Sequence, residues 1–285
     1  MTVPRVLCAL AVVALVCSRA TAAPPAFEAA SVKPAPPKSR PVMEGGPGTS
    51  DPNRIRCRIS LRYLVMAAYR TGSSQLSAPA WLDDRLFEIT ATLPPGTTGA
   101  QLRTMLQGLL SERFHLTIHR EQKEMVAYTL GIGKGGPKLK EATDQAANTT
   151  ADDFDPLPSG PPNELELDGE GYPIVPPTEG SWLVALRSGR ARTHQFHASM
   201  RDLAGLLENQ LGRPVADVTG LTGRYEFTLS WMAGDPAPSA NVQASDSGPD
   251  LPAALKQQLG LSLQSSKESV EVLVIDSIDR EPAAN

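Results

Sequence analysis

The chain carries the same series of helix and strand patterns twice, and no other feature constrains its fold as strongly. Residues 87–93 (FEITATL) and 225–231 (YEFTLSW) both alternate strictly between apolar and polar positions. This alternation is typical of a strand that buries one face. The expected buried faces consist of Phe87, Ile89, Ala91 and Leu93 in the first stretch and of Tyr225, Phe227, Leu229 and Trp231 in the second.

Helix patterns flank both strands in the same order. Upstream, residues 59–69 and 198–208 place Ser60 and Ser199 where each can cap a helix, and apolar residues follow at helical spacing. Downstream, an apolar stripe in each copy predicts a second helix. Its members are Leu102, Met105, Leu106, Leu109 and Leu110 in the first copy and Leu251, Ala254, Leu255 and Leu259 in the second.

Short strands complete each copy. The first strands are expected near 54–58 and 193–197, and the last ones at 114–118 and 126–132 and at 261–263 and 270–276. Each copy therefore has the order β–α–β–α–β–β, which predicts an internal duplication. Short strands mixed with helices predict an α+β fold of two related small modules, each a short mixed sheet with two helices on one face.

Composition indicates where the modules begin and end. Residues 141–180 contain ten acidic residues and seven prolines but no lysine or arginine, and such a composition predicts a mobile linker. A similar insert at 234–248 interrupts the second copy. We expect a signal peptide at 1–22, a first module at 23–140, an acidic, proline-rich linker at 141–191 and a second module at 192–285.

The N-terminus has the pattern of a signal peptide. Arg5 precedes an apolar run from Val6 to Val16, and Ala20-Thr21-Ala22 offers small residues for cleavage before Ala23. The run is short for a membrane span, although a retained anchor is the alternative. No later stretch is long and apolar enough to cross a bilayer. We therefore expect the mature protein in the periplasm or outside the cell.

Charge and cysteine content narrow the classes of function. A net charge of −4 argues against a nucleic-acid partner. Cys57 is the only cysteine after the signal region, so no internal disulfide is possible. A half-buried strand position is the favoured interpretation of Cys57, ahead of a nucleophile.

Several motifs, in this order, resemble one known family. They are FEAASVKP (27–34), PAWLD (79–83), MLQGLLSERFHLTIHRE (105–121), KGGPKL (134–139), GRPVADVTGLTGRYEFTL (212–229), QQLGLSL (257–263) and VLVID (272–276). They are similar to the soil-associated family of exported proteins that is abundant in Acidobacteria and has no established activity. Ala78 and Glu226 depart from its usual glycine and aspartate.

The resemblance implies docking and does not imply catalysis. Some relatives carry this region attached to a membrane-embedded, sensor-type peptidase, which implies an extracytoplasmic sensing or docking module. Each repeat is also similar to the short N-terminal domain of secretins and TonB-dependent receptors. That domain docks other proteins.

The candidate catalytic residues form no strong constellation. His194 and His197 are three apart on an expected strand and so point to opposite faces, which disfavours a metal site. His115 and His119 are expected in a strand that leads into a polar turn. A turn is expected at Asp83 and Asp84, and Glu88 is expected on the solvent-facing side of a strand. No nucleophile elbow, HExxH motif or P-loop occurs, so we predict no catalytic residue, metal or cofactor.

Five residues are candidates for binding a partner. Trp81 is large enough to anchor an interface. Lys134 and Lys138, in the loop KGGPK, could hold an anion, although a plain loop is the alternative. Arg213 and Arg224 flank the corner TGLTGR, where Gly220 and Gly223 permit positive φ. These arginines either support the corner or contact a partner.

The favoured function is noncatalytic binding of an envelope or secreted protein, through an exposed sheet edge or the loops beside it. Addition of a partner's strand is a general way in which such edges recognise chains. The alternative is an extracytoplasmic hydrolase whose site lies between the two modules.

Overall fold

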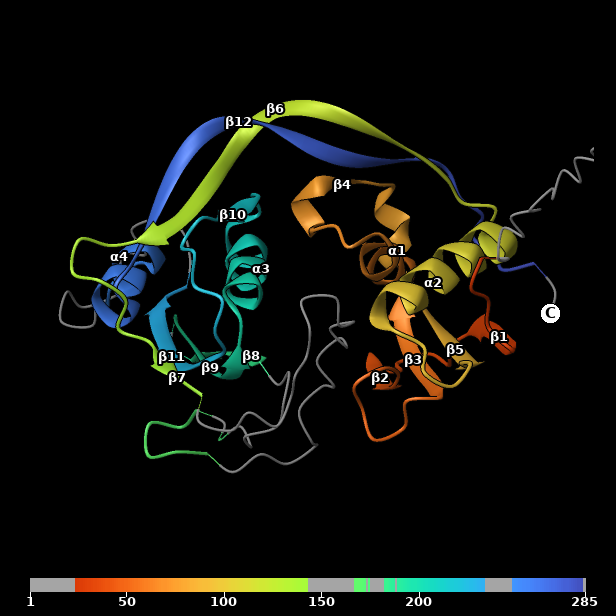
Figure 1. The fold of residues 1–285 in the computed structure, drawn as a ribbon, viewed down its shortest axis with the longest axis horizontal. Coiled ribbons are helices and arrows are strands. Elements are labelled where there is room, and N and C mark those ends of the chain that lie inside the picture. Colours follow the sequence, from red (N-terminus) through yellow and green to blue (C-terminus); the bar gives the residue numbers. More distant parts are fainter. Residues whose placement is uncertain are drawn as a thin grey trace, which may run out of the picture.

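The computed structural model describes residues 24–142, 167–172, 174, 182–187, 189–233 and 248–283, with only the backbone for 182–187. The expected signal peptide, most of the expected linker and nearly all of the insert at 234–248 lie outside these residues. The described part is α+β, as predicted, and consists of two modules joined by a long two-stranded ribbon (Figure 1).

The first module contains an antiparallel sheet, here called the first sheet, and two helices. Its strand order is β1 (Ala29–Pro34), β5 (Leu86–Thr92), β3 (Arg54–Ser60) and β2 (Val42–Gly45). The helices are α1 (Leu61–Tyr69) and α2 (Gly99–Phe114). Between α1 and β5 lie the short elements η1 (Ser73–Gln75), β4 (Leu76–Ser77) and η2 (Ala80–Asp83).

The second module has an antiparallel sheet with the corresponding strand order, here called the second sheet. Its strands are β7 (Lys140–Glu141), β11 (Tyr225–Met232), β9 (Arg190–Ala198) and β8 (Trp182–Arg187). Its helices are α3 (Met200–Leu211) and α4 (Leu251–Ala254), and α4 continues as the π-helical turn η3 (Leu255–Leu259). In both sheets the strand that comes first in the chain pairs with the strand that comes last, and the second strand lies at the opposite edge.

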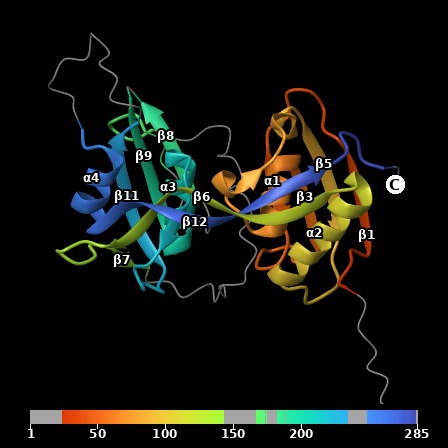
Figure 2. The same cartoon turned by 90° about the horizontal axis from the view of Figure 1, so that it is seen from above.

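The ribbon consists of β6 (Thr117–Ile132) and β12 (Leu261–Ser277), which pair antiparallel along almost their whole length. Two short strands extend it into a four-stranded sheet of order β10, β6, β12, β4, in which β10 (Val215–Asp217) and β4 lie parallel to their neighbours. Seen from above, the two strands run side by side from one module to the other (Figure 2).

The ribbon corrects one prediction. The strands expected at 114–118 and 126–132 are one strand, and those expected at 261–263 and 270–276 are another. The polar residues after His119, expected to form a turn, contain neither glycine nor proline, so nothing in them interrupts an extended backbone. Neither module therefore keeps its expected last strands in its own sheet; these strands form the ribbon that both modules share.

The helices of each module are packed between its sheet and one end of the ribbon (Figure 1). The first core joins the first sheet, α1 and α2 to Leu273 and Ile275 of β12. The second core joins the second sheet, α3 and η3 to Leu130 of β6 and Leu261 of β12. The predicted apolar faces of β5 and β11 and the predicted stripes of α2 and α4–η3 are all buried.

The predicted caps are confirmed. The hydroxyl of Ser60 accepts a hydrogen bond from the amide of Tyr63 at the start of α1. At the start of α3, Ser199 and Asp202 form a capping box, in which each side chain accepts from the other's backbone amide. These caps satisfy amides that have no partner within the helix.

The two modules also meet directly, at η1 and α3. Glu208 of α3 is buried, and its Oε1 accepts hydrogen bonds from the Ser74 amide (3.2 Å) and the Ser74 hydroxyl (2.7 Å). A side chain at Gly72 would overlap the same carboxylate. The contact fixes the start of the β4 segment against the second module.

Candidate functional site

The middle of the ribbon is a long, exposed stretch of regular structure. All six residues from His119 to Glu124 of β6 are exposed, and so are those from Gln264 to Ser269 of β12. Polar side chains cover both faces of the ribbon here. Between the two cores, none of the described helices or sheets packs against these faces (Figure 1). The sequence signal for this segment is the polar run itself, which predicts a turn as readily as an exposed strand.

The β6 edge is open over residues 117–127. β10 covers the outer side of β6 at Tyr128, Thr129 and Leu130, and no described strand lies beside β6 before them. The Tyr128 amide donates to the Pro214 carbonyl (2.8 Å), and the Val218 amide donates to the Leu130 carbonyl (2.9 Å). Tyr128 and Leu130 therefore turn their backbone groups away from β12.

Alternate residues of a regular strand turn their backbone groups to the same side. Outward-facing amides and carbonyls are therefore expected on the even-numbered residues of the open stretch, which are Ile118, Arg120, Gln122, Glu124 and Val126. The register of β6 with β12 is regular from Leu261 to Ile275, so no bulge interrupts this series. The β6 edge can therefore accept a further strand.

The β12 edge, residues 261–272, is open in the same way but is partly covered at one end. β4 pairs with Leu273 and Val274, and the side-chain amide of Gln75 donates to the Glu271 carbonyl (3.3 Å). Side chains also link the two strands across the ribbon. Arg120 forms an ion pair with Glu271, and the Ser269 hydroxyl donates to Gln122 Oε1 (3.2 Å).

The predicted binding residues do not form one site, because they lie on separate elements of both modules. Trp81 lies in η2, half-buried against the first core, with the Arg280 guanidinium 4.7 Å from its ring centre. Lys134 and Lys138 are exposed. The backbone amide and the ammonium group of Lys138 donate to carbonyls of η3, those of Leu259 (2.8 Å) and Gln257 (3.0 Å), so Lys138 caps a helix end.

The two arginines of the TGLTGR corner differ in their roles. Arg224 is half-buried and donates to the His197 carbonyl (3.2 Å) and to Asp202 (3.5 Å), so it supports the corner between β9, α3 and β11. Arg213 is exposed, directly before the Pro214 carbonyl that ends the open stretch of β6. Gly220 has φ +69°, as predicted. Gly223 does not have positive φ; the Tyr225 ring passes so close that a Cβ would lie 2.9 Å from its hydroxyl.

The histidine pairs do not converge on a metal. His115 and His119 each contact a different carboxylate, Asp279 and Asp276, at 2.8 Å. The His194 ring stacks on Phe196, and His197 has φ +51° at a bulge of β9. Within the described ranges, no three His, Cys, Asp or Glu side chains are grouped so that they could hold a metal ion.

The predicted acidic turn and the lone cysteine have structural surroundings. Asp83 accepts from Arg62 (2.6 Å), and Glu88 contacts Lys33 (3.2 Å) and Arg58 (3.7 Å). The hydrogen bond from Lys33 lowers the pKa of the Glu88 carboxyl. Burial raises the pKa of the Cys57 thiol to about 12, and the thiolate that a nucleophile needs is therefore scarce at neutral pH.

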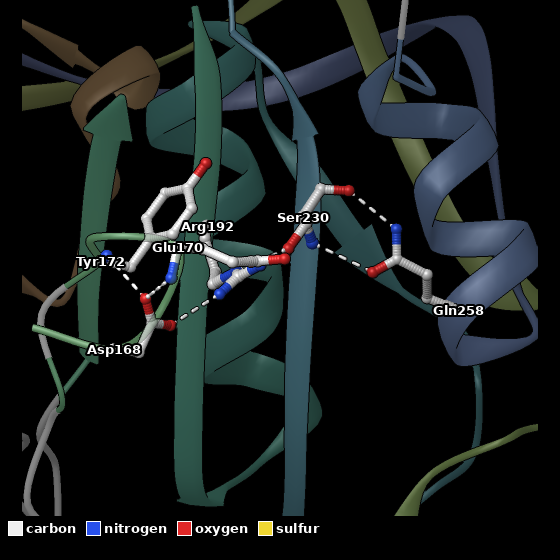
Figure 3. Close-up of polar contacts among 6 residues, drawn as sticks. All are labelled: Asp168, Glu170, Tyr172, Arg192, Ser230 and Gln258. Atoms are coloured by element: carbon white, nitrogen blue, oxygen red, sulfur yellow. Dashed lines mark hydrogen bonds and ion pairs between the residues drawn. The ribbon is translucent and has the colours of Figure 1, made fainter. Parts of the chain in front are cut away.

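Part of the acidic segment is docked on the second sheet, which its composition did not predict. Asp168 Oδ1 accepts from the amides of Glu170 and Tyr172, both at 2.9 Å, and so forms a tight turn (Figure 3). Arg192 of β9 pairs with Asp168 (2.9 Å) and with Glu170, and its guanidinium lies 4.1 Å from the centre of the Tyr172 ring. The expectation of an unpacked linker therefore does not hold for residues 167–172.

This docked turn is expected to respond to acid. The hydrogen bond from the Tyr172 amide, together with Arg192, holds the pKa of Asp168 below its ordinary 3.8. A lowered carboxyl pKa adds stability above the unfolded value, and that stability is lost as the pH falls through the folded value. The Tyr172 amide resonance in NMR should therefore move toward its unfolded position below pH 3.8. In the Asp168→Asn variant the Tyr172 amide resonance should no longer move with pH. If it still moved as in the unmodified protein, Asp168 would not be the group that titrates.

The chain matches the model of one protein family. A protein-family model matches residues 62–278, from the first turn of α1 to the end of β12. The chain belongs to the family described as protein of unknown function (DUF3738). The DUF3738 match covers the second module, both strands of the ribbon and the helices of the first module, whereas β1, β2 and β3 precede it. No curated protein and no solved structure matches the chain. Among the described residues of this DUF3738 member, no helix has the length and apolar character needed to cross a membrane.

Proposed function

We propose that the chain is an exported, noncatalytic docking module that binds other proteins by adding a strand to an open edge of the ribbon. The observation that carries this proposal is the open backbone of β6 between Thr117 and Ala127, with its outward amides and carbonyls unpaired by any described strand. An unpaired strand edge is a template for another chain, and main-chain hydrogen bonds supply affinity without a pocket.

The ribbon differs from an edge that the fold blocks. At the outer edge of β11, the side-chain amide of Gln258 pairs with both backbone groups of Ser230, at 3.0 Å and 2.7 Å (Figure 3). There the side chain occupies the place of a further strand. Along the open stretch of β6, no proline, glycine or bulge has this effect. Its charged side chains disfavour apolar strands and so favour a partner of complementary charge.

Two further points support docking outside the cytoplasm. The corresponding strand orders of the two sheets agree with the proposed internal duplication, whose repeat is similar to the short docking domain of secretins and TonB-dependent receptors. The apolar run after Arg5 and the small residues before Ala23 have the pattern of a signal peptide, so the partner is expected in the envelope or outside the cell.

Site-specific crosslinking tests the proposal. The photoreactive residue benzoylphenylalanine replaces Gln122 at the β6 edge, Ser269 at the β12 edge, or Tyr63, which is exposed on α1. The protein is expressed in its own host, and its mature N-terminus is expected near Ala23. Edge positions should yield adducts with a second polypeptide chain, either another envelope protein or a second copy of this chain, whereas Tyr63 should yield none. Absence of such adducts from both edges would overturn docking through the ribbon.

A further inference from the structure

We propose that the partner at the β6 edge is a second copy of this chain, paired antiparallel about a twofold axis through Gln122. The inference rests on the proposed function, because it takes the open ribbon edge as an interaction surface. It commits that edge to self-association and leaves the β12 edge for a different protein.

The geometry of the edge defines where such an axis can lie. The open stretch runs from Thr117, the first residue of β6, to Ala127, the last before the residues that β10 covers. Gln122 is its midpoint. In a twofold pair centred there, Ile118 lies opposite Val126 of the second copy, and Arg120 opposite Glu124. These residues have outward backbone groups, so the pair would make about ten main-chain hydrogen bonds.

The side chains are complementary in this register. Residues directly opposite each other lie on the same face of the sheet, where unlike charges attract. On the face of the even-numbered residues, Arg120 meets Glu124 of the second copy, Gln122 meets its own equivalent, and Ile118 meets Val126. On the other face, Glu121 meets Lys123 of the second copy. By symmetry each of these pairs occurs twice, except that of Gln122 with its own equivalent, which lies on the axis.

Neighbouring registers lose this complementarity. A twofold axis always places one residue opposite its own equivalent, and a shift by one residue places Glu121 or Lys123 there. A shift by two residues places Arg120 or Glu124 there. Each of these meetings joins like charges, which destabilises a cross-strand pair. Among axes from 120 to 124, only Gln122 brings neutral residues together at the axis, so charge selects the same register as the limits of the open stretch.

The β12 edge lacks this self-complementarity. Its open residues run from Leu261 to Val272, with the midpoint between Ser266 and Lys267. An axis through Lys267 would bring two lysines together. An axis through Ser266 would place Lys267 opposite Ser265 and Glu268 opposite Gln264, so it would pair no unlike charges. The Glu271 carbonyl is already engaged by Gln75 (3.3 Å), which shortens the edge further. A second copy is therefore expected on β6 and not on β12.

Charge reversal on Glu121 and Lys123 tests the register. Within the chain these residues lie opposite Val272 and Val270 of β12, so their charges are not part of a cross-strand ion pair in the ribbon. The purified mature protein is expected to sediment as a dimer at about 100 µM. Glu121→Lys or Lys123→Glu should raise the dimer dissociation constant by about tenfold or more. The double exchange should restore it, which a general effect of surface charge would not do.

A proline pair tests the edge. Gln122→Pro removes an outward-facing amide and leaves the ladder to β12, and proline is tolerated on an edge whose amide faces solvent. It should abolish the dimer, whereas Ser269→Pro, the matched change on β12, should leave it intact; circular dichroism checks the fold of both. A monomeric wild-type protein, or a dimer sensitive to Ser269→Pro alone, would overturn the inference. Envelope adducts from Ser269 would still support docking in that case.

Discussion

Phe227→Ala is expected to lower the free energy of unfolding by about 3–5 kcal/mol. Phe227 lies on the apolar face of β11 and is buried against α3 and η3 in the second core. Truncation leaves a cavity that a core held between a sheet and two helical segments cannot fully close. Ile89→Ala, at the matching place on β5 in the first core, should cost about 2–5 kcal/mol by the same mechanism. Urea denaturation of each purified variant measures both values.

The residue next to Phe227 supplies the control. Glu226 is on the opposite face of β11, where it contacts Lys140 (3.1 Å) at the surface. Exposed ion pairs contribute little, so Glu226→Ala should change stability by no more than about 0.5 kcal/mol. A loss below about 1 kcal/mol for Phe227→Ala would mean that the strand faces were assigned in the wrong register.

Sequence patterns were sufficient where the structure depends on residues close together in the chain. The strict alternation around Ile89 and Phe227 identified both central strands and their buried faces. Ser60 and Ser199 marked the starts of two helices, because a capping side chain acts on amides only two or three residues away. The α+β class followed from the order of these elements.

The ribbon could not be predicted in this way, because its pairing joins residues far apart in the chain. Gln122 of β6 lies opposite Glu271 of β12, and no local pattern specifies that partner. A polar run without breakers suits either a turn or an exposed strand, and the alternation that indicates a strand needs one buried face. The open edge, on which the proposed function rests, therefore became visible only with the pairing of the strands.

The docked acidic turn was missed for a related reason. The acidic, proline-rich composition of residues 141–180 predicted a mobile linker, but it could not show that Arg192 would hold Asp168 and Glu170. An ion pair with a stacked tyrosine needs only a few residues. Averages over forty positions hide such a contact.

Leu130→Ala is expected to destabilise the second module, although β6 follows the helices of the first. Leu130 is fully buried in the second core, beside Leu261 and the helices α3 and η3. The loss should be about 2–5 kcal/mol. Hydrogen exchange should show the first loosening in α3, η3 and the second sheet, because sub-global opening follows the damaged core.

Ile275→Ala is the corresponding change in β12. This strand follows the helices of the second module in the chain, but its Ile275 packs in the first core. It should loosen α1, α2 and the first sheet instead. Ile132→Ala, two residues beyond Leu130 and 44% exposed, serves as the control and should cost no more than about 0.5 kcal/mol. If Leu130→Ala loosened the first sheet and spared α3, each module would keep its own strands and the ribbon would not cross between them. Each substitution is expected to loosen the module at the far end of its strand, because each core is completed by a strand that begins in the other module.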